Sequence, residues 1–445
     1  MDNSVKNMTE ETISAISTPA GLGGVAIIRV SGSGALTIAE KMFAPSGKSA
    51  VRNFEPNKMY AGRILCDGFS DFGLCVYFKA PKSFTGEDVV EFHCHGGVQI
   101  ARGVLSATFC AGARPAERGE FTKRAFVNGK LSLSSAEGMI DMINAESLAE
   151  VRAGGLLYQE KLTSEVKKIQ LKLTDMLAGI AADCDYPEEG IEETELGGVG
   201  NELSEILNGI NALVAAYSGG KFIKSGVSAA ICGAPNVGKS SLLNALLGYD
   251  KAIVSPHAGT TRDAVEGTVQ IDGVKYNFTD TAGIRAEAGE IEAMGIERAK
   301  RALSSSDVVV CVSDTGDFSA AAGVPDSRLV KVFSKSDVRE STGGYDVAVS
   351  SVTGAGLENL KSLIARKVTG AGSLENAYVI EERHYSALKR AAEKLKAAAE
   401  GVGCFPLDLI SLDIREGWRI LGEITGETAD EEIINTVFSK FCVGK

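Results

Sequence analysis

Eight residues near the middle of the chain combine glycines, a lysine and a hydroxyl group at a spacing that suits phosphate binding. Residues 233–240 read Gly-Ala-Pro-Asn-Val-Gly-Lys-Ser, between an apolar run at 229–232 and the helix-forming segment SLLNALL. In a strand–loop–helix setting, the backbone N–H groups of such a loop surround phosphate oxygens, Lys239 reaches the outer phosphates and the Ser240 hydroxyl binds Mg²⁺. We expect the remaining phosphate contacts to come from Asn236, Val237, Gly238 and Ser241.

Two later segments would complete a nucleotide switch. Thr260 and Thr261, in the run GTTRD, offer a hydroxyl ligand to the metal. Asp280 and Gly283, in the run DTAG at the end of a predicted strand, would reach the metal through water and contact the terminal phosphate. Three such segments in this order favour a nucleotide hydrolase over a chance glycine-rich turn.

The residue after the DTAG run is unusual for such a hydrolase. Ras-like enzymes place a glutamine there to orient the attacking water, whereas this chain has Ile284, which cannot hold a water molecule. Another group must therefore polarise the water. The candidates are three acidic residues that follow, for which a solvated acidic loop is the alternative interpretation: Glu287, Glu290 and Glu292.

The base is predicted to be guanine. Ser334, Lys335 and Asp337 follow a predicted strand in the run SKSD, which resembles the N-K-x-D motif of GTPases with serine in place of asparagine. A carboxylate at Asp337 accepts hydrogen bonds from guanine N1 and N2, which adenine does not offer, so GTP is favoured over ATP. Because a hydroxyl cannot replace both the donor and the acceptor of an amide, we expect Ser334 to weaken nucleotide binding and base discrimination. A second base-reading segment, resembling the S-A-x element, is Ser350, Ser351 and Val352.

Composition and charge limit the class of protein. The 445 residues predict two to four domains, and 44% hydrophobic with 23% charged residues is typical of a globular protein. A net charge of −12 argues against extensive nucleic-acid coating and leaves room for a local basic patch. Nine cysteines without a C-x-x-C pair favour a reducing compartment over a disulfide framework. With no signal peptide or membrane-spanning run, we predict a cytoplasmic protein with no membrane contact.

The elements that position these motifs change character along the chain. Short β-rich runs at 25–30 and 89–93 predict an α+β domain, and apolar residues at helical spacing between 166 and 213 predict amphipathic helices. Strands alternate with helices from 225, with one antiparallel edge predicted by the hairpin signal Asp272-Gly273, and helices resume after 372. We therefore expect an α/β domain inserted into a helical one. The predicted domains are 1–130, 131–222, 223–371 and 372–445.

Motifs along nearly the whole chain resemble the MnmE (TrmE) family of tRNA uridine-34 modification GTPases. Besides the segments above, they are PAGLGG with IIRVSG near the N-terminus, FTGEDVVEFHCHGG at 84–97, RPAERGEFTKRAFVNGKLSL at 114–133 and the final FCVGK. The resemblance implies a multidomain α/β and α protein: an N-terminal α+β domain that binds a tetrahydrofolate derivative and forms the homodimer, a discontinuous helical domain, and an inserted Ras-like P-loop G domain.

The resemblance also implies the activity. Members of this family hydrolyse GTP with Mg²⁺ in a potassium-stimulated reaction. Together with an FAD-dependent partner of the MnmG (GidA) type they add an aminomethyl or carboxymethylaminomethyl group to C5 of the wobble uridine of tRNA. The carbon comes from the folate derivative.

Particular residues match the functional positions of the family. Glu292 matches the glutamate that polarises water, and Asn236 matches an asparagine that binds K⁺, for which the 252–260 loop would supply further ligands at Ser255, His257 and Thr260. Cys442 matches the family's terminal cysteine. Candidates to hold the folate are Arg29, Glu87 and Arg118, whereas Leu22 replaces a common arginine. The run His93-Cys94-His95 contains side chains that can bind a metal, although metal binding is the weaker interpretation.

Several alternatives stay open at the level of sequence. Cys442 could be a small buried hydrophobic residue, and a basic run at 114–130 suits either RNA or plain solvent. A regulatory or ribosome-assembly GTPase without one-carbon chemistry is the main alternative function. An aminomethyltransferase with a decaying G domain is a third possibility, raised only by Ser334.

Overall fold

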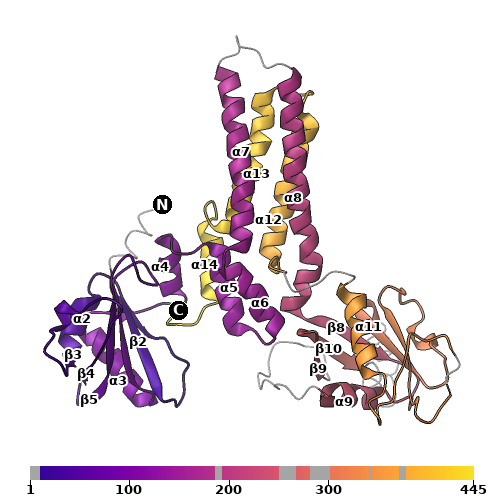
Figure 1. Ribbon diagram of the computed structural model, residues 1–445, viewed down its shortest axis with the longest axis horizontal. Helices are drawn as coiled ribbons and strands as arrows, with labels where there is room; N and C mark the ends of the chain where they lie inside the picture. The colour runs from indigo at the N-terminus through magenta and orange to yellow at the C-terminus, as the bar shows by residue number, and fades with distance from the viewer. Residues whose placement is uncertain (1–10, 186–192, 250–266, 281–300, 341–342, 370–376) are drawn as a thin grey trace, which may run out of the picture. The chain divides into compact units, whose positions relative to one another are not determined.

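The computed structural model describes residues 11–185, 193–249, 267–280, 301–340, 343–369 and 377–445. The chain divides into two compact units (Figure 1). The first contains residues 1–140, 158–170 and 421–445, and the second contains residues 141–157 and 171–420. Both units therefore combine segments that are far apart in the sequence.

A seven-stranded sheet dominates the first unit, in the order β3-β4-β5-β6-β2-β1-β7. Neighbouring strands are antiparallel, except that β1 and β7 are parallel. The predicted strands at 25–30 and 89–93 are present as β2 and β6. The bounds are β1 (Ile13–Ile16), β2 (Val25–Ser31), β3 (Phe43–Pro45), β4 (Met59–Cys66), β5 (Phe69–Phe78), β6 (Val89–His95) and β7 (Arg114–Pro115).

Within the described residues, helices cover one face of this sheet across most of its strands, whereas the other face is covered mainly near β1, where Phe121 packs with Ile13 and Ala15. Helices α2 (Ala35–Met42) and α3 (Val98–Ala111), with the short 3₁₀ helix η1 (Val51–Asn53), pack on the face that carries Ile28, Ile64 and Phe92. Because strand residues alternate between faces, Val25, Met59 and Phe72 lie on the other face. Each of them is more than half exposed.

Three more helices complete the first unit. Helices α4 (Glu120–Val127), α5 (Leu133–Asn144) and α14 (Glu431–Ser439) share a core with Leu133, Phe438 and Phe441 at its centre. Helix α14 begins at Asp430, whose carboxylate accepts the N–H of Ile433 at 2.8 Å. Such a cap satisfies a backbone donor that the first turn leaves unpaired.

A six-stranded sheet forms the centre of the second unit, in the order β13-β12-β11-β8-β10-β9. All pairs are parallel except β9 with β10. The turn between those two strands is Asp272-Gly273, with φ of 51° and 78°, which confirms the predicted hairpin and its antiparallel edge. The bounds are β8 (Val227–Cys232), β9 (Gly267–Ile271), β10 (Val274–Asp280), β11 (Val308–Ser313), β12 (Leu329–Phe333) and β13 (Val347–Ala348).

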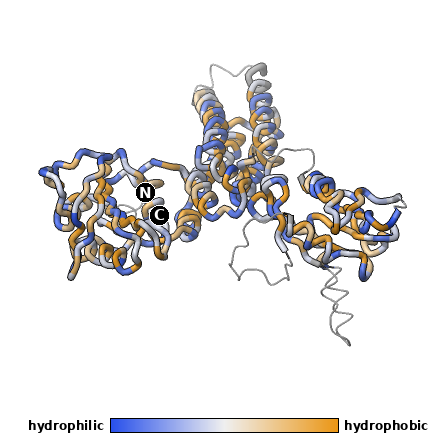
Figure 2. Tube along the Cα trace, turned by 60° about the horizontal axis from the view of Figure 1, so that its bottom comes forward, coloured by the Kyte–Doolittle hydropathy of each residue, from blue (hydrophilic) through white to orange (hydrophobic). Residues whose placement is uncertain are grey.

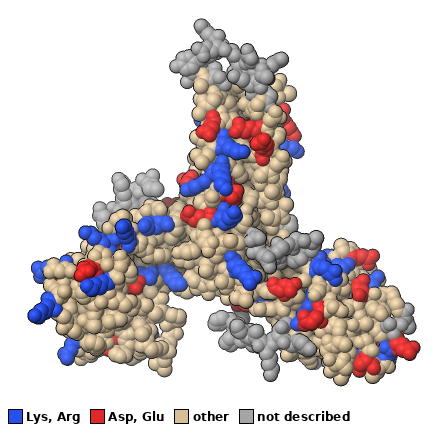
Figure 3. Space-filling view, viewed as in Figure 1, with Lys and Arg blue, Asp and Glu red and all other residues tan. Residues whose placement is uncertain are grey.

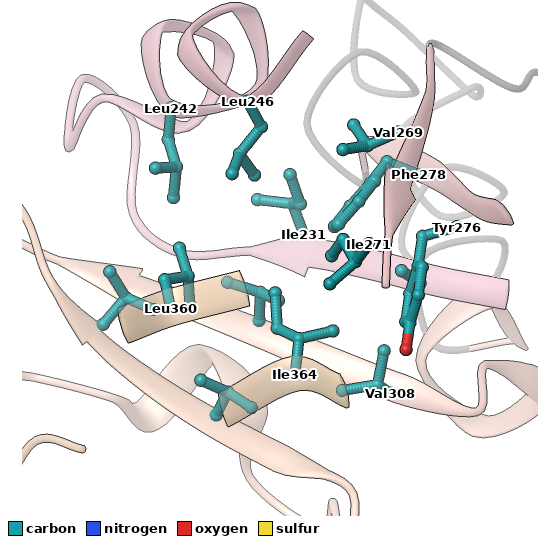
Figure 4. Packing of buried hydrophobic residues seen from close by; sticks show 14 of the residues in the cluster. Ile231, Leu242, Leu246, Val269, Ile271, Tyr276, Phe278, Val308, Leu360 and Ile364 are labelled. Atoms are coloured by element: carbon teal, nitrogen blue, oxygen red, sulfur yellow. The ribbon is translucent and has the colours of Figure 1, made fainter. Parts of the chain in front are cut away.

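Apolar residues cover both faces of this sheet. Helices α9 (Lys239–Tyr249) and α11 (Leu357–Thr369) place Leu242 and Leu360 against Ile231 and Phe278, as Figure 4 shows. The opposite face packs against a segment that includes the 3₁₀ helix η4 (Ser319–Ala321). Burial on both faces explains why the central strands are apolar at nearly every position, seen as orange stretches in Figure 2.

Four long helices form a bundle: α7 (Lys161–Asp185), α8 (Glu193–Ser225), α12 (Glu382–Gly401) and α13 (Leu407–Thr425). Helix α8 packs along α12, where the rings of Tyr217 and Tyr385 stack at 4.5 Å. Helix α13 reaches α7 through Trp418, whose indole N–H donates to the Thr174 hydroxyl at 3.1 Å. The predicted amphipathic helices are confirmed, with Val166, Leu173 and Ile180 among those buried. The shorter α6 (Leu148–Tyr158) precedes α7.

None of the helices that the structure describes combines the length and the apolar character that a membrane span needs.

Candidate functional site

The predicted phosphate loop, residues 233–240, connects β8 to α9. Three residues of this loop have a positive φ, which is 143° at Gly233, 61° at Asn236 and 98° at Gly238. A Cβ atom at Gly233 would collide with the carbonyl oxygen of Val312, so only glycine fits there. Val237 is buried in the core of the sheet and anchors the loop. Val237 thus fixes the loop to the core of the sheet.

Lys239 lies over this loop at the start of α9. Its Nζ donates to the carbonyl oxygens of Gly233 at 3.0 Å and Ala234 at 2.8 Å, and the residue is 7% exposed. An ammonium group has three protons, so one remains for a phosphate oxygen while both carbonyls stay bound. Ser240 and Ser241 follow at the helix N-terminus, where the helix dipole favours anions, and both are exposed. The arrangement suits a phosphate chain with its metal.

The predicted base-reading segment, 334–337, follows β12 and contacts the phosphate loop twice. The Ser334 hydroxyl donates to the carbonyl of Val237 at 2.6 Å, and Lys335 Nζ donates to the carbonyl of Asn236 at 2.8 Å. Lys335 also pairs with Asp314 Oδ2 at 2.7 Å, and this hydrogen bond lowers the pKa of the Asp314 carboxyl. Asp337 is exposed. Phosphate and base elements are therefore joined directly.

The second base-reading segment, 350–352, lies beside the first. The N–H of Ser336 donates to the carbonyl of Val349 at 3.2 Å. Ser350 is fully buried and its hydroxyl accepts the N–H of Thr353, whereas Ser351 is half-buried and Val352 is exposed. The structure thus brings together the two segments that the sequence analysis assigned to guanine.

Asp314 was missed by the sequence analysis. It follows β11 directly, and it holds Lys335 and Arg339, which approaches its Oδ2 at 3.4 Å. The sequence could have indicated this residue, because parallel sheets bind ligands at the carboxyl ends of their strands and Asp314 follows such a strand.

Several predicted residues lie outside the described residues: Ser255, His257, Thr260, Thr261, Gly283 and Glu292. Asp280 ends β10 opposite Ile231 of β8, one strand from the phosphate loop, and its side chain is also outside the described part. Their roles stay predictions.

In the first unit, the predicted folate residues have different surroundings. Arg29 Nε pairs with Glu91 Oε1 at 2.8 Å, and its guanidinium lies over the rings of Phe84 and Phe121. Arg118 is exposed, and its side chain forms no hydrogen bond to the described residues. Glu87 instead belongs to an internal network, described next. Of the three, Arg118 is the one whose charged group faces solvent without a partner in this part of the chain.

Four charged residues form a largely buried network that joins β7 and α4 to the segment before β6. Arg124 is 2% exposed and reaches Glu87 Oε2 and Glu120 Oε1, each at 3.0 Å. Arg114 pairs with Glu120 Oε1 at 2.6 Å. Burial alone would raise the pKa of Glu120, but the two arginines and the N–H of Glu117 lower it. Arg114 and Arg124 therefore form ion pairs within the protein, and fewer residues of the basic run 114–130 remain as candidates for RNA contact.

The final residues of the chain pack against the start of α4 and the end of β1. Val443 forms a β-bridge with Arg118, and the N–H of Gly119 donates to the carbonyl of Cys442 at 3.4 Å. Gly119 has φ of 68°, and a Cβ there would lie 2.5 Å from the carbonyl oxygen of Phe438. Cys442 itself is exposed, so the interpretation of a buried hydrophobic residue is wrong. The predicted cysteine and a predicted folate residue thus lie on adjoining backbone.

Metal binding by the run 93–95 finds no support in the described part of the chain. No three His, Cys, Asp or Glu side chains gather there as metal ligands would. His93 contacts Glu91 at 3.4 Å, Cys94 is buried, and His95 Nδ1 lies 2.7 Å from Asp71 Oδ1. The eight cysteines whose side chains are described are all free.

Comparison with known proteins decides the family. Residues 12–130 match the model "GTP-binding protein TrmE N-terminus", and residues 133–442 match "MnmE helical domain". The tRNA modification GTPase MnmE of Natranaerobius thermophilus is 36% identical over 98% of this chain and 100% of its own length. The protein of that name from Thermus thermophilus is 38% identical over 98% and 99%. The chain belongs to the MnmE family of tRNA modification GTPases.

MnmE family membership agrees with the resemblance found in the sequence motifs. Among solved structures, the G domain of the T. maritima FeoB iron transporter aligns with 32% of this chain and 98% of its own, at 28% identity and a TM-score of 0.25. The family assignment rests on the full-length MnmE relatives, which match both units of the chain.

Proposed function

We propose that this chain hydrolyses GTP to drive modification of the wobble uridine of tRNA. The observation that carries the proposal is the phosphate loop at the end of β8, where Lys239 keeps a proton for a phosphate and the segment 334–337 is bonded to the same loop. Phosphate and guanine would then be held by one continuous set of contacts. A nucleotide site built in this way supports a hydrolase.

The metals would lie beside the phosphates. Ser240, at the exposed start of α9, has the hydroxyl that suits Mg²⁺, and Thr261 is the second candidate. For K⁺ the candidates are Asn236, in the exposed turn of the loop, and Ser255, His257 and Thr260. A bound cation supplies positive charge where the transition state gains negative charge, and so stands where other GTPases use an arginine.

We also propose that the G domain, residues 223–371, is an insertion between the halves 131–222 and 372–445 of one helical domain. Support comes from the packing of α8 on α12, the two helices that flank the six-stranded sheet in the sequence. The match of one helical-domain model across 133–442 agrees with this arrangement. The N-terminal domain would be residues 1–130.

A one-carbon site is proposed where the tail meets the N-terminal domain. Arg118 presents a guanidinium that suits a glutamate carboxylate of tetrahydrofolate, and Cys442 adjoins it through the bridge at Val443. Arg29 is a further candidate. Glu87 is the weaker candidate, because its carboxylate already accepts hydrogen bonds from Ser31 and Arg124. The folate would supply the carbon, while these residues bind and orient it.

The proposed partners are tRNA, a second copy of the chain and an FAD-dependent enzyme of the MnmG type. The exposed apolar side chains of Val25, Met59 and Phe72 on the less covered sheet face support dimer formation, because exposed apolar surface often marks interaction sites. On the visible face of the N-terminal unit, Lys and Arg outnumber Asp and Glu (Figure 3), which supports contact with an anionic RNA. Such an enzyme would work in the cytoplasm.

Nucleoside analysis of tRNA from cells lacking this protein tests the proposal. We expect loss of the C5 modification at wobble uridines, restored by the wild-type gene but by neither Lys239→Ala nor Cys442→Ser. If tRNA stays fully modified while ribosomal subunits accumulate unassembled, the chain is an assembly GTPase instead. In that case the docking of Cys442 beside Arg118 would have no chemical purpose.

A further inference from the structure

Ser334 is tied to the phosphate loop by its side chain. Its hydroxyl lies 2.6 Å from the carbonyl oxygen of Val237 and 3.3 Å from that of Ser313. The residue is 3% exposed and its own N–H donates to the Ser313 carbonyl at 2.8 Å. Ser334 therefore faces the loop and the sheet.

The proton count at this hydroxyl is decisive. The two atoms that the Ser334 hydroxyl contacts are backbone carbonyl oxygens. Carbonyl oxygens can only accept hydrogen bonds, so the hydroxyl must donate to one of them. The shorter contact, to Val237, takes the single proton. No donor is left at Ser334 for a ligand, and donating elsewhere would leave a buried carbonyl unpaired.

The edge of a guanine base that carries N7 and O6 offers only acceptors. We infer that Ser334 is a positioning residue, which locks the phosphate loop to the base-reading segment, and that N7 of the bound purine is not read. This inference rests on the proposed GTP site. Guanine recognition then depends on Asp337, whose carboxylate accepts from N1 and N2.

The adjacent residue strengthens this division of roles. Lys335 Nζ is bonded to the carbonyl of Asn236, next to Val237, and to Asp314. Two neighbouring residues thus hold two neighbouring carbonyls of the phosphate loop. Asp337, in contrast, is exposed and forms no side-chain hydrogen bond to the described residues. Because N7 is common to guanine and adenine, loss of that contact lowers affinity without relaxing the choice between them, in contrast to the weaker discrimination expected from the sequence alone.

The test compares three nucleotides on the full-length wild-type chain by equilibrium binding. We expect 7-deaza-GTP, which lacks N7, to bind within about twofold of GTP. ITP, which lacks the N2 amino group, should bind about 10- to 100-fold more weakly, because it leaves the Asp337 carboxylate partly unpaired. A preference of tenfold or more for GTP over 7-deaza-GTP would overturn the inference. Absence of GTP binding would instead overturn the proposed function, and the inference with it.

Variants separate positioning from base contact. Ser334→Ala should weaken all three nucleotides by a similar factor, about 5- to 30-fold, with their ratios unchanged. Ser362→Ala, at an exposed position on α11 outside the proposed nucleotide site, is the matched control and should leave binding near wild type. Ser334→Asn restores two amide donors and should make the chain prefer GTP over 7-deaza-GTP and bind GDP more tightly. A Ser334→Ala variant that weakens GTP but spares 7-deaza-GTP would show that Ser334 contacts the base.

Discussion

The backbone N–H of Gly119 donates to the carbonyl of Cys442 at 3.4 Å, so the last residues of the chain belong to the N-terminal unit. The contact needs the left-handed backbone of Gly119 and the close approach to Phe438 that only glycine allows. It leaves the Cys442 side chain exposed, one residue before the backbone bridge to Arg118. An exposed thiol contributes little to the packing of the core.

Exchange of that thiol should therefore spare stability. We expect Cys442→Ser to unfold at nearly the same temperature as wild type, because no buried site is disturbed, and to hydrolyse GTP normally. Modified wobble uridine should be lost in the host strain. Thermal midpoint, GTP turnover and tRNA nucleosides are measured on the same variant.

A matched control comes from another exposed cysteine. Cys110, at the end of α3, is free and exposed as well, and Cys110→Ser should leave all three readouts unchanged. Retention of tRNA modification in Cys442→Ser would rule out a chemical role for this thiol.

Potassium should stimulate GTP hydrolysis strongly relative to sodium. Asn236 has φ of 61°, so Asn236→Gly removes the side chain while keeping a backbone that glycine adopts freely. The expected result is loss of the potassium effect with nearly unchanged GTP affinity. Equal rates of the wild-type protein in the two salts would argue against a cation site.

Hydrolysis should also depend on Glu292, which lies outside the described residues. Because Ile284 cannot orient water, Glu292→Ala is expected to reduce GTP turnover by about 10²-fold or more, with little change in affinity. Glu287→Ala is the control in the same acidic run and should retain most of the activity. The comparison uses single-turnover rates, and near-normal turnover in Glu292→Ala would transfer the role to another group.

The buried network around Glu120 should make stability depend on pH. Its arginine partners hold the pKa of Glu120 below the usual 4.5, so the charged form stabilises the fold at pH above 4.5. This contribution disappears as the pH falls below 4.5 and through the lowered pKa. Glu120→Gln should lower the free energy of unfolding by about 3–5 kcal/mol at neutral pH, because it leaves Arg124 partly unpaired in the interior.

Denaturant titrations at neutral and acidic pH check this prediction. The gap between wild type and Glu120→Gln should shrink well below pH 4.5, whereas the exposed neighbour Glu117→Gln should match wild type throughout. A gap that stays constant with pH would mean that the ionised carboxylate is not the source of the stability.

Local patterns predicted much of this fold. The dipeptide Asp272-Gly273 predicts the hairpin, because a two-residue loop needs residues that accept positive φ. The apolar periodicity between 166 and 213 predicts α7 and α8. The phosphate loop is recognisable for the same reason, since all its parts lie within eight residues.

Pairings between distant segments could not be predicted in this way. Arg124 looks like an exposed basic residue in the sequence, yet it is buried on α4 and pairs with Glu87, 37 residues earlier, in the segment before β6. Likewise, the sequence around Ser334 does not indicate that its hydroxyl donates to the carbonyl of Val237, 97 residues away. Such contacts depend on how the strands are ordered, which no local spacing encodes.

The docking of the tail has a consequence for how the protein is made. The Ser17 hydroxyl donates to the carbonyl of Gly444 across 427 residues of chain, at 3.1 Å. At ordinary synthesis speeds of about 5–20 residues per second, these two groups leave the ribosome roughly 20 to 90 seconds apart. The N-terminal sheet must wait through the synthesis of the whole G domain before it receives its last segment.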